Sequence, residues 1–238
     1  MSSTDEPQKL EHVVVKSTLP RQPLPLNVDR RPIITERLTI RAFDASDLDA
    51  LHELRRQPEV MKWTMQGRID HDKEETQARL DVFLPPNDAK HYNYAICLKE
   101  TGEFIGIGGF HGRISSFGWP EVGYMLKREF WGKGYATEFL KAWLVEYEKL
   151  PREEIERSVD PRSVVPIPAG DEDGEKDCTR AREVLIAVTE ESNPRSHNIL
   201  RKCGFELFCT WITTDSKDPD GVAKVVLPTF RYLPAPRS

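Results

Sequence analysis

Apolar residues recur along this chain at two different periods, and the pattern predicts strands interspersed with helices. The first strand is expected within residues 34–43, where Leu38, Ile40 and Ala42 alternate with their neighbours. Pro228 has no N–H to donate to a strand ladder, so the last strand is expected at a sheet edge or a bulge. Further strands are predicted at residues 92–98, 104–110, 120–126, 184–189, 205–214 and 224–232.

Helices are predicted where apolar residues recur at three-residue intervals. Asp44 and Asp47 have the spacing of a capping pair, and the stripe of Leu48, Leu51 and Leu54 follows them. Strands and helices in this order indicate an α/β (α+β) fold. Further helices are expected at residues 72–83, 135–149 and 193–203, and residues 59–71 are expected to be irregular.

Two segments follow neither period. Residues 1–32 are polar and contain five prolines, which predicts a flexible N-terminal arm, mobile or wrapped on the surface. Residues 151–182 are rich in charge, proline and glycine, which predicts a surface insertion that is disordered in part. Residues 33–238 are expected to form one domain that carries this insertion.

Composition narrows the possible functions. Of the 238 residues, 38% are hydrophobic and 31% are charged, which is enough apolar material for a globular core. The formal net charge of −5, without a basic stripe, argues against nucleic-acid binding. The four cysteines form no CxxC pair, which argues against a metal site or a disulfide framework. No signal-peptide or membrane-spanning run is found, so a cytoplasmic protein is expected.

The most informative stretch is EVGYMLKREFWGKGYATEFLKAWL, residues 121–144. A strand ends near Leu126, a loop contains Gly132, Lys133 and Gly134, and a helix begins directly afterwards. Unpaired N–H groups and the positive end of a helix dipole would meet there, and such a point binds phosphate oxygens. Tyr135 follows the loop where a Walker A motif needs Ser or Thr, and residue 137 is Thr where a dinucleotide fingerprint needs Gly.

Three motifs in order resemble the GNAT superfamily of N-acetyltransferases, and most closely its ribosomal-protein alanine and serine N-acetyltransferase branch (RimJ/RimL type). TERLTIR (residues 35–41) is similar to the start of that branch. EVGY and WGKGYATE (residues 121–138) are similar to its acyl-CoA loop, and Asn193, Ser196, Lys202, Gly204 and Phe205 match its later helix. The resemblance covers about residues 34–214.

This resemblance implies a fold and a cosubstrate site. The GNAT fold has a mixed, mostly antiparallel central sheet with helices on both faces, and its fourth and fifth strands splay apart. Acetyl-CoA is the expected cosubstrate, with its pantetheine arm in the splay and no metal required. The residues expected to contact it are Met125, Leu126, Gly132, Lys133, Gly134, Tyr135, Ala136, Thr137 and Asn193.

Two side chains are candidates for proton transfer. Glu121 shares one strand face with Gly123 and Met125, and it is a candidate general base or a solvated strand glutamate. Ser196 is a candidate proton donor to the departing thiolate, or a helix serine with a local backbone bond. His111 is interpreted as structural or exposed, and the segment around Trp63, Met65 and His71 is expected to border the acceptor pocket.

The predicted function is transfer of an acetyl group from acetyl-CoA to a primary amine by direct attack in a ternary complex. A small molecule or a protein N-terminus would be the acceptor, and the enzyme would be a monomer or a homodimer. The alternative is a non-catalytic acyl-CoA-binding module that acts through a protein partner. Both hypotheses need the same glycine loop, so turnover with amines must separate them.

Overall fold

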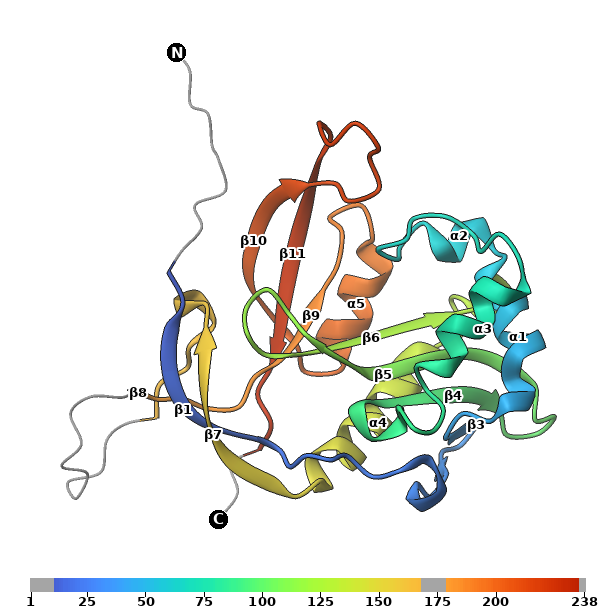
Figure 1. Ribbon diagram of the computed structural model, residues 1–238, viewed down its shortest axis with the longest axis horizontal. Coiled ribbons are helices and arrows are strands. Elements are labelled where there is room, and N and C mark those ends of the chain that lie inside the picture. The colour runs from blue at the N-terminus through green and yellow to red at the C-terminus, as the bar shows by residue number, and fades with distance from the viewer. Residues whose placement is uncertain (1–10, 168–178, 236–238) are drawn as a thin grey trace.

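Eight strands form one sheet in the computed structural model, which describes residues 11–167 and 179–235 (Figure 1). The strand order is β10-β11-β9-β6-β5-β4-β3-β2, and β6–β9 is its one parallel pair in the described chain. The sheet is therefore mixed and mostly antiparallel, as predicted. Its strands are β2 (Ile33–Ile34), β3 (Leu38–Arg41), β4 (Tyr92–Leu98), β5 (Phe104–Ile114), β6 (Pro120–Leu126), β9 (Leu185–Val188), β10 (Glu206–Thr214) and β11 (Lys224–Tyr232).

Helices cover both faces of this sheet, also as predicted. On one face, α4 and α5 enclose the largest cluster of buried side chains. On the other face, α1 and α3 enclose a second cluster that includes Phe43, Leu51 and Leu80. The helices are α1 (Leu48–Arg55), α2 (Pro58–Met61), α3 (Lys73–Asp81), α4 (Tyr135–Lys149) and α5 (Pro194–Lys202).

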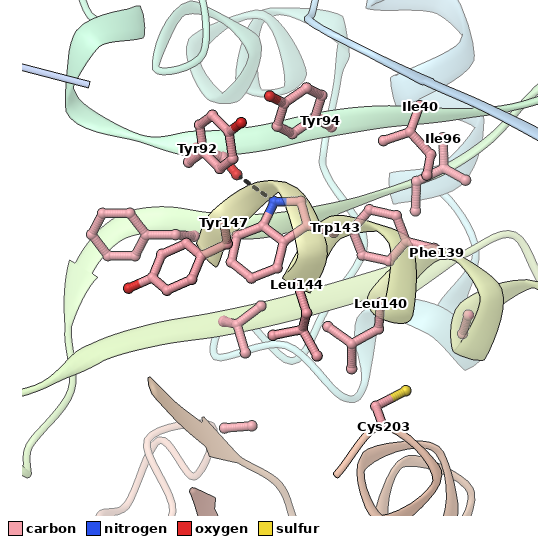
Figure 2. Close-up of a cluster of buried hydrophobic side chains, with 14 of the residues drawn as sticks. Ile40, Tyr92, Tyr94, Ile96, Phe139, Leu140, Trp143, Leu144, Tyr147 and Cys203 are labelled. Atoms are coloured by element: carbon pink, nitrogen blue, oxygen red, sulfur yellow. Dashed lines mark hydrogen bonds between the residues drawn. The ribbon is translucent and has the colours of Figure 1, made fainter. Parts of the chain in front are cut away.

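Helix α4 supplies the centre of the larger cluster (Figure 2). Trp143 is fully buried, and its indole N–H donates to the carbonyl of Tyr92 at 2.9 Å. The Trp143 and Tyr147 rings stack with centroids 4.9 Å apart. Because these large side chains sit one turn apart on a single face, burying them fixes α4 against β4 and β5.

The predicted capping pair is present. The Asp44 side chain accepts from the N–H of Ser46, and the Asp47 carboxylate accepts from the N–H of Asp44. This pair caps a turn of 3-10 helix, Ala45–Asp47, and α1 follows that turn. Helix α1 therefore begins later than the spacing indicates. Residues 59–61, predicted to be irregular, belong to the short helix α2, which begins at Pro58.

The N-terminal segment differs from the prediction. Residues 13–20 form strand β1 (Val13–Pro20), which pairs along its whole length with β7 (Arg152–Val159), and β8 (Thr179–Arg180) completes a three-stranded sheet. Alternate side chains such as Val15, Leu19 and Val159 are buried in a third apolar cluster. The mobile alternative is therefore wrong for residues 13–20, which pack against the domain as the surface-wrapped alternative expects. Residues 152–159 belong to the same small sheet. Residues 1–10 and 168–178 lie outside the described chain, and a domain boundary at residue 32 stays a prediction.

Arg30 attaches the N-terminal segment to the main sheet. Its guanidinium is buried and donates to the carbonyls of Pro25, Asp88, His91 and Asn93 at 2.5–3.2 Å. It also lies over the rings of Tyr92 and Tyr94. A charged donor with several buried acceptors is costly to remove, because the acceptors then have no partner.

We expect Arg30→Ala to lower the free energy of unfolding by at least about 2 kcal/mol, because it leaves buried carbonyls unpaired and opens a cavity. Urea unfolding followed by tryptophan fluorescence measures this difference. Arg31→Ala is the matched control, since Arg31 is exposed and adjacent in sequence. Equal, small effects of the two substitutions would contradict the anchoring role of Arg30.

Strand β11 is not at a sheet edge, because it lies between β10 and β9. Pro228 pairs with Thr210 on β10, and β9 pairs with β11 only from Thr229 onward. The missing N–H of Pro228 thus falls beyond the stretch that β9 covers. The expected edge position is wrong for the strand, because the Pro228 carbonyl also accepts from the N–H of Thr189, directly after β9, at 3.1 Å. The other expectation, a bulge, agrees with the register shift between Leu207 and Cys209 of β10, beside the proline.

Candidate active site

Strands β6 and β9 separate beside the centre of the sheet. Within the described chain they pair in register only at Glu121 and Ile186. Beyond that point β6 continues to Leu126 along β5, whereas β9 is held by β11. Figure 1 shows the two strands leaving in different directions. The predicted splay is therefore present, and the backbone of Met125 and Leu126 lies on the β6 side of it.

The glycine loop lies between β6 and α4, where the sequence places it. Gly132 and Gly134 have φ angles of +74° and +85°, in the left-handed region that favours glycine. Gly134 is the N-cap of α4, and no side chain caps this helix end. The N–H groups of Tyr135, Ala136 and Thr137 therefore begin the helix without a capping side chain, beside an exposed Lys133. This arrangement is suited to phosphate oxygens.

A hydrogen bond connects the two sides of the splay. The Tyr124 hydroxyl on β6 and the Ser196 hydroxyl on α5 are 2.9 Å apart. Burial is the main cause that raises the pKa of Tyr124, so its hydroxyl stays protonated at neutral pH. The Asn193 side chain accepts from the N–H of Ser196 at 3.2 Å and caps α5. The serine hydroxyl thus contacts Tyr124 across the splay, a contact that the sequence alone does not predict.

Glu121 lies on the sheet face covered by α1 and α3. It alternates with Gly123 and Met125, and Met125 packs against the apolar cluster on that face. The His111 imidazole covers Gly123: a Cβ at Gly123 would lie 2.6 Å from its Nε2. Only glycine leaves room for this ring. The structure therefore brings His111, interpreted from sequence as structural or exposed, onto the same face as Glu121.

Trp131 borders the splay at its open end. Its indole N–H donates to the carbonyl of Leu126 at 2.7 Å, and the guanidinium groups of Arg128 and Arg195 lie over its ring at 5.1 and 5.4 Å. Arg128 comes from the turn before the glycine loop, and Arg195 lies in the first turn of α5. Positive charge thus surrounds the region between β6 and α5.

The segment 62–67 meets the connection between β10 and β11. Lys217 donates to the carbonyl of Lys62 at 3.2 Å and forms an ion pair with Glu190. Trp63 is half-buried and Met65 is exposed in this segment. Two segments that are distant in sequence therefore meet at Lys217, next to the predicted acceptor side.

A buried ion pair between Arg55 and Asp70 holds the connection between α2 and α3 to α1. Asp70 is fully buried, and Arg55 Nε and Nη2 lie 2.6 and 2.8 Å from its two oxygens. Thr76 and Gln66 also donate to Asp70. Burial opposes ionisation of Asp70, but the hydrogen bonds from Arg55, Thr76 and Gln66 outweigh it and lower its pKa to about 2.

We expect Asp70→Asn to lower the free energy of unfolding by about 3 kcal/mol at pH 7, because Arg55 keeps a buried charge without a carboxylate. The pKa of Asp70 is lower folded than unfolded, so its contribution is complete above pH 4 and is lost as the pH falls toward 2. Urea unfolding across this range should show the two proteins converging at acid pH. Glu75→Gln is the control, since its pair with Arg68 is half exposed and its loss should cost much less.

Comparisons with known proteins agree with this geometry. The profile of the acetyltransferase (GNAT) domain family matches residues 37–206. An uncharacterized N-acetyltransferase, p20, from Bacillus licheniformis is 35% identical over 137 residues, which are 55% of this chain and 74% of that protein.

Solved structures share the fold at lower sequence identity. The ribosomal L7/L12 alpha-N-protein acetyltransferase RimL, in complex with coenzyme A, superposes with a TM-score of 0.57 at 19% identity, covering 85% of this chain and 98% of that one. A Vibrio cholerae spermidine N-acetyltransferase, in complex with CoA and spermine, also gives 0.57 at 14% identity, covering 84% and 97%.

Within the described residues, no group of three or more His, Cys, Asp or Glu side chains is placed to hold a metal ion. No helix in that part of the chain is long and apolar enough to cross a membrane.

The family profile spans more than two thirds of the chain and includes the splay and the glycine loop. The chain therefore belongs to the GNAT acetyltransferase family and is an N-acetyltransferase.

Proposed function

We propose that this enzyme transfers the acetyl group of acetyl-CoA to a primary amine by direct attack in a ternary complex. The observation that carries the proposal is the splay of β6 and β9 beside the uncapped start of α4. The pantetheine arm would enter the splay along Met125 and Leu126, next to Asn193. The pyrophosphate would bind the loop from Gly132 to Thr137, where left-handed glycines bring backbone N–H groups close to its oxygens.

Protons must move at two points of this reaction. The amine nitrogen forms a bond to the acetyl carbon while the carbon–sulfur bond breaks, so the amine loses a proton and the thiolate gains one. We assign removal of the amine proton to Glu121, directly or through water. We assign donation of a proton to the thiolate to Ser196. The Tyr124 hydroxyl, hydrogen-bonded to Ser196 and protonated at neutral pH, supports that donor. A backbone N–H at Met125 or Leu126 would stabilise charge on the acyl oxygen.

The cysteines support direct attack over a covalent acyl-enzyme. Cys97 and Cys203 are buried, and burial raises the pKa of both thiols, that of Cys203 to about 11. Burial also raises the pKa of the half-buried Cys209. A protonated thiol is a poor nucleophile. Cys178 lies outside the described residues.

The acceptor class is tested by release of free CoA thiol from acetyl-CoA across a panel of amines. The panel contains peptides with N-terminal Ala or Ser, polyamines, aminoglycosides and aryl amines. We expect thiol release above the amine-free rate with at least one of these classes. Tight acetyl-CoA binding without release for any amine would instead support the non-catalytic binding module.

A further inference from the structure

Three residues from two separate motifs meet at the start of α4. Thr35 and Arg37 lie in the connection from β2 to β3, and Glu138 lies in the first turn of α4. Glu138 Oε1 accepts from the Thr35 hydroxyl at 2.6 Å and from the Arg37 N–H at 2.8 Å. Arg37 Nε and Nη2 lie 2.7 and 2.6 Å from Glu138 Oε2. Both oxygens of the carboxylate are therefore held.

Arg37 also contacts the glycine loop directly. Its Nη1 donates to the carbonyl of Lys133 at 3.0 Å, and its guanidinium carbon lies 4.5 Å from the centre of the Tyr135 ring. A Cβ at Gly134 would lie 3.4 Å from Nη2. One side chain thus contacts Lys133 in the loop, Tyr135 at the start of α4 and the carboxylate of Glu138 in its first turn.

The charges in this contact favour an anion on the loop. A carboxylate in the first turn interacts with the helix dipole and would repel a phosphate placed nearby. The guanidinium of Arg37 neutralises Glu138 at close range. A guanidinium has five N–H donors, and these contacts use three of them. The remaining donors, on a side chain that is 41% exposed, are available to a phosphate oxygen.

We propose that Thr35, Arg37 and Glu138 form a polar clamp that positions the glycine loop for the phosphates of acyl-CoA, with Arg37 as its central positioning residue. This inference rests on the proposed binding of acetyl-CoA at that loop. It gives a role to the TERLTIR segment, whose position in the sequence is about one hundred residues before the loop. The clamp pre-organises the backbone donors, so its loss weakens binding without removing any of those donors.

The test is titration calorimetry with CoA on the full chain. Arg37→Ala should raise the Kd for CoA by at least about tenfold, with the stoichiometry unchanged. Destabilisation alone would instead lower the competent fraction and hence the stoichiometry. Arg231→Ala is the matched control, because Arg231 also pairs with a glutamate, Glu206, and lies over an aromatic ring, Phe208, outside the loop. It should leave the Kd near that of the wild type.

Two more variants sharpen the test. Combining Arg37→Ala with Glu138→Gln should weaken binding no more than Arg37→Ala alone, since both substitutions break one clamp. Thr35→Val removes a single donor and should raise the Kd by a smaller factor, which also serves as the test if Arg37→Ala does not fold. An unchanged Kd in folded Arg37→Ala, or independent additive effects of the two substitutions, would overturn the clamp. A wild-type protein that binds no CoA would overturn the proposed function instead.

Discussion

Gly134→Asp is expected to raise the Kd for CoA by roughly 10²–10³-fold while the protein stays folded. The substitution places a carboxylate at the start of α4, where the pyrophosphate is proposed to bind. Two like charges about 4 Å apart near a protein surface repel by about 4 kcal/mol. Its Cβ would also lie 3.4 Å from Arg37 Nη2, so the new carboxylate would compete with Glu138 for the Arg37 guanidinium. Titration calorimetry with CoA measures the change.

Backbone strain must be separated from charge in this experiment. Gly134 has a φ of +85°, and a residue with a Cβ is strained there. Asparagine tolerates the left-handed region about as well as aspartate, so Gly134→Asn keeps the strain and omits the charge. We expect Gly134→Asn to weaken binding far less than Gly134→Asp.

A second control tests whether the position matters. Gly102 has a φ of +74° with nothing within 4 Å of an added Cβ, and it lies in the turn between β4 and β5. Gly102→Asp therefore adds the same charge and similar strain away from the loop, and it should leave CoA binding intact. Wild-type affinity for CoA in folded Gly134→Asp would contradict binding of the pyrophosphate at this loop.

The order of the main elements follows from the sequence because local patterns determine it. Alternating or continuous apolar runs predict β3, β4, β5, β6, β9, β10 and β11, and each is present in the structure. The glycine loop is predicted as well, since an uncapped helix start behind Gly134 is a property of neighbouring residues. The splay of β6 and β9 comes from the resemblance to GNAT enzymes, because no local pattern encodes how two strands separate.

The small sheet of β1, β7 and β8 shows where local patterns mislead. Val13, Val15 and Leu19 alternate along β1, and Ile155 and Val159 have matching parity on β7. The prolines around β1 and the charged residues of β7 are typical of irregular segments, so composition predicts no strand at either place. Each strand is too short to be stable alone, and their pairing across more than 130 residues provides the stability.

Contacts between distant segments could not be predicted from the sequence. The Tyr124–Ser196 hydrogen bond joins a strand to a helix 72 residues later, and Arg37 reaches Glu138 across 101 residues. His111 lies over Gly123 only because β5 and β6 pair as they do. Residue types and spacing indicate candidates for chemistry, whereas tertiary packing decides which of them meet.

Glu121→Gln is expected to lower the rate constant for acetyl transfer by roughly 10²–10⁴, the usual contribution of a general base. The amide keeps the size and the hydrogen-bonding capacity of the side chain but cannot accept the amine proton. The rate of a base-assisted reaction falls as the pH drops and the carboxylate becomes protonated, so the variant should lose this acidic limb of its pH–rate profile. CoA affinity should stay near that of the wild type, because the glycine loop is unchanged.

Two further variants decide whether Glu121 is the proton acceptor. Glu103→Gln is the matched control, because Glu103 is an exposed glutamate directly before β5, and its substitution should leave turnover unchanged. His111→Gln tests the imidazole that lies over Gly123 on the same sheet face. Wild-type turnover in Glu121→Gln, with the acidic limb lost only in His111→Gln, would assign the proton to the imidazole. If both variants keep wild-type turnover, the amine loses its proton to solvent, and the enzyme accelerates transfer by holding amine and thioester in position.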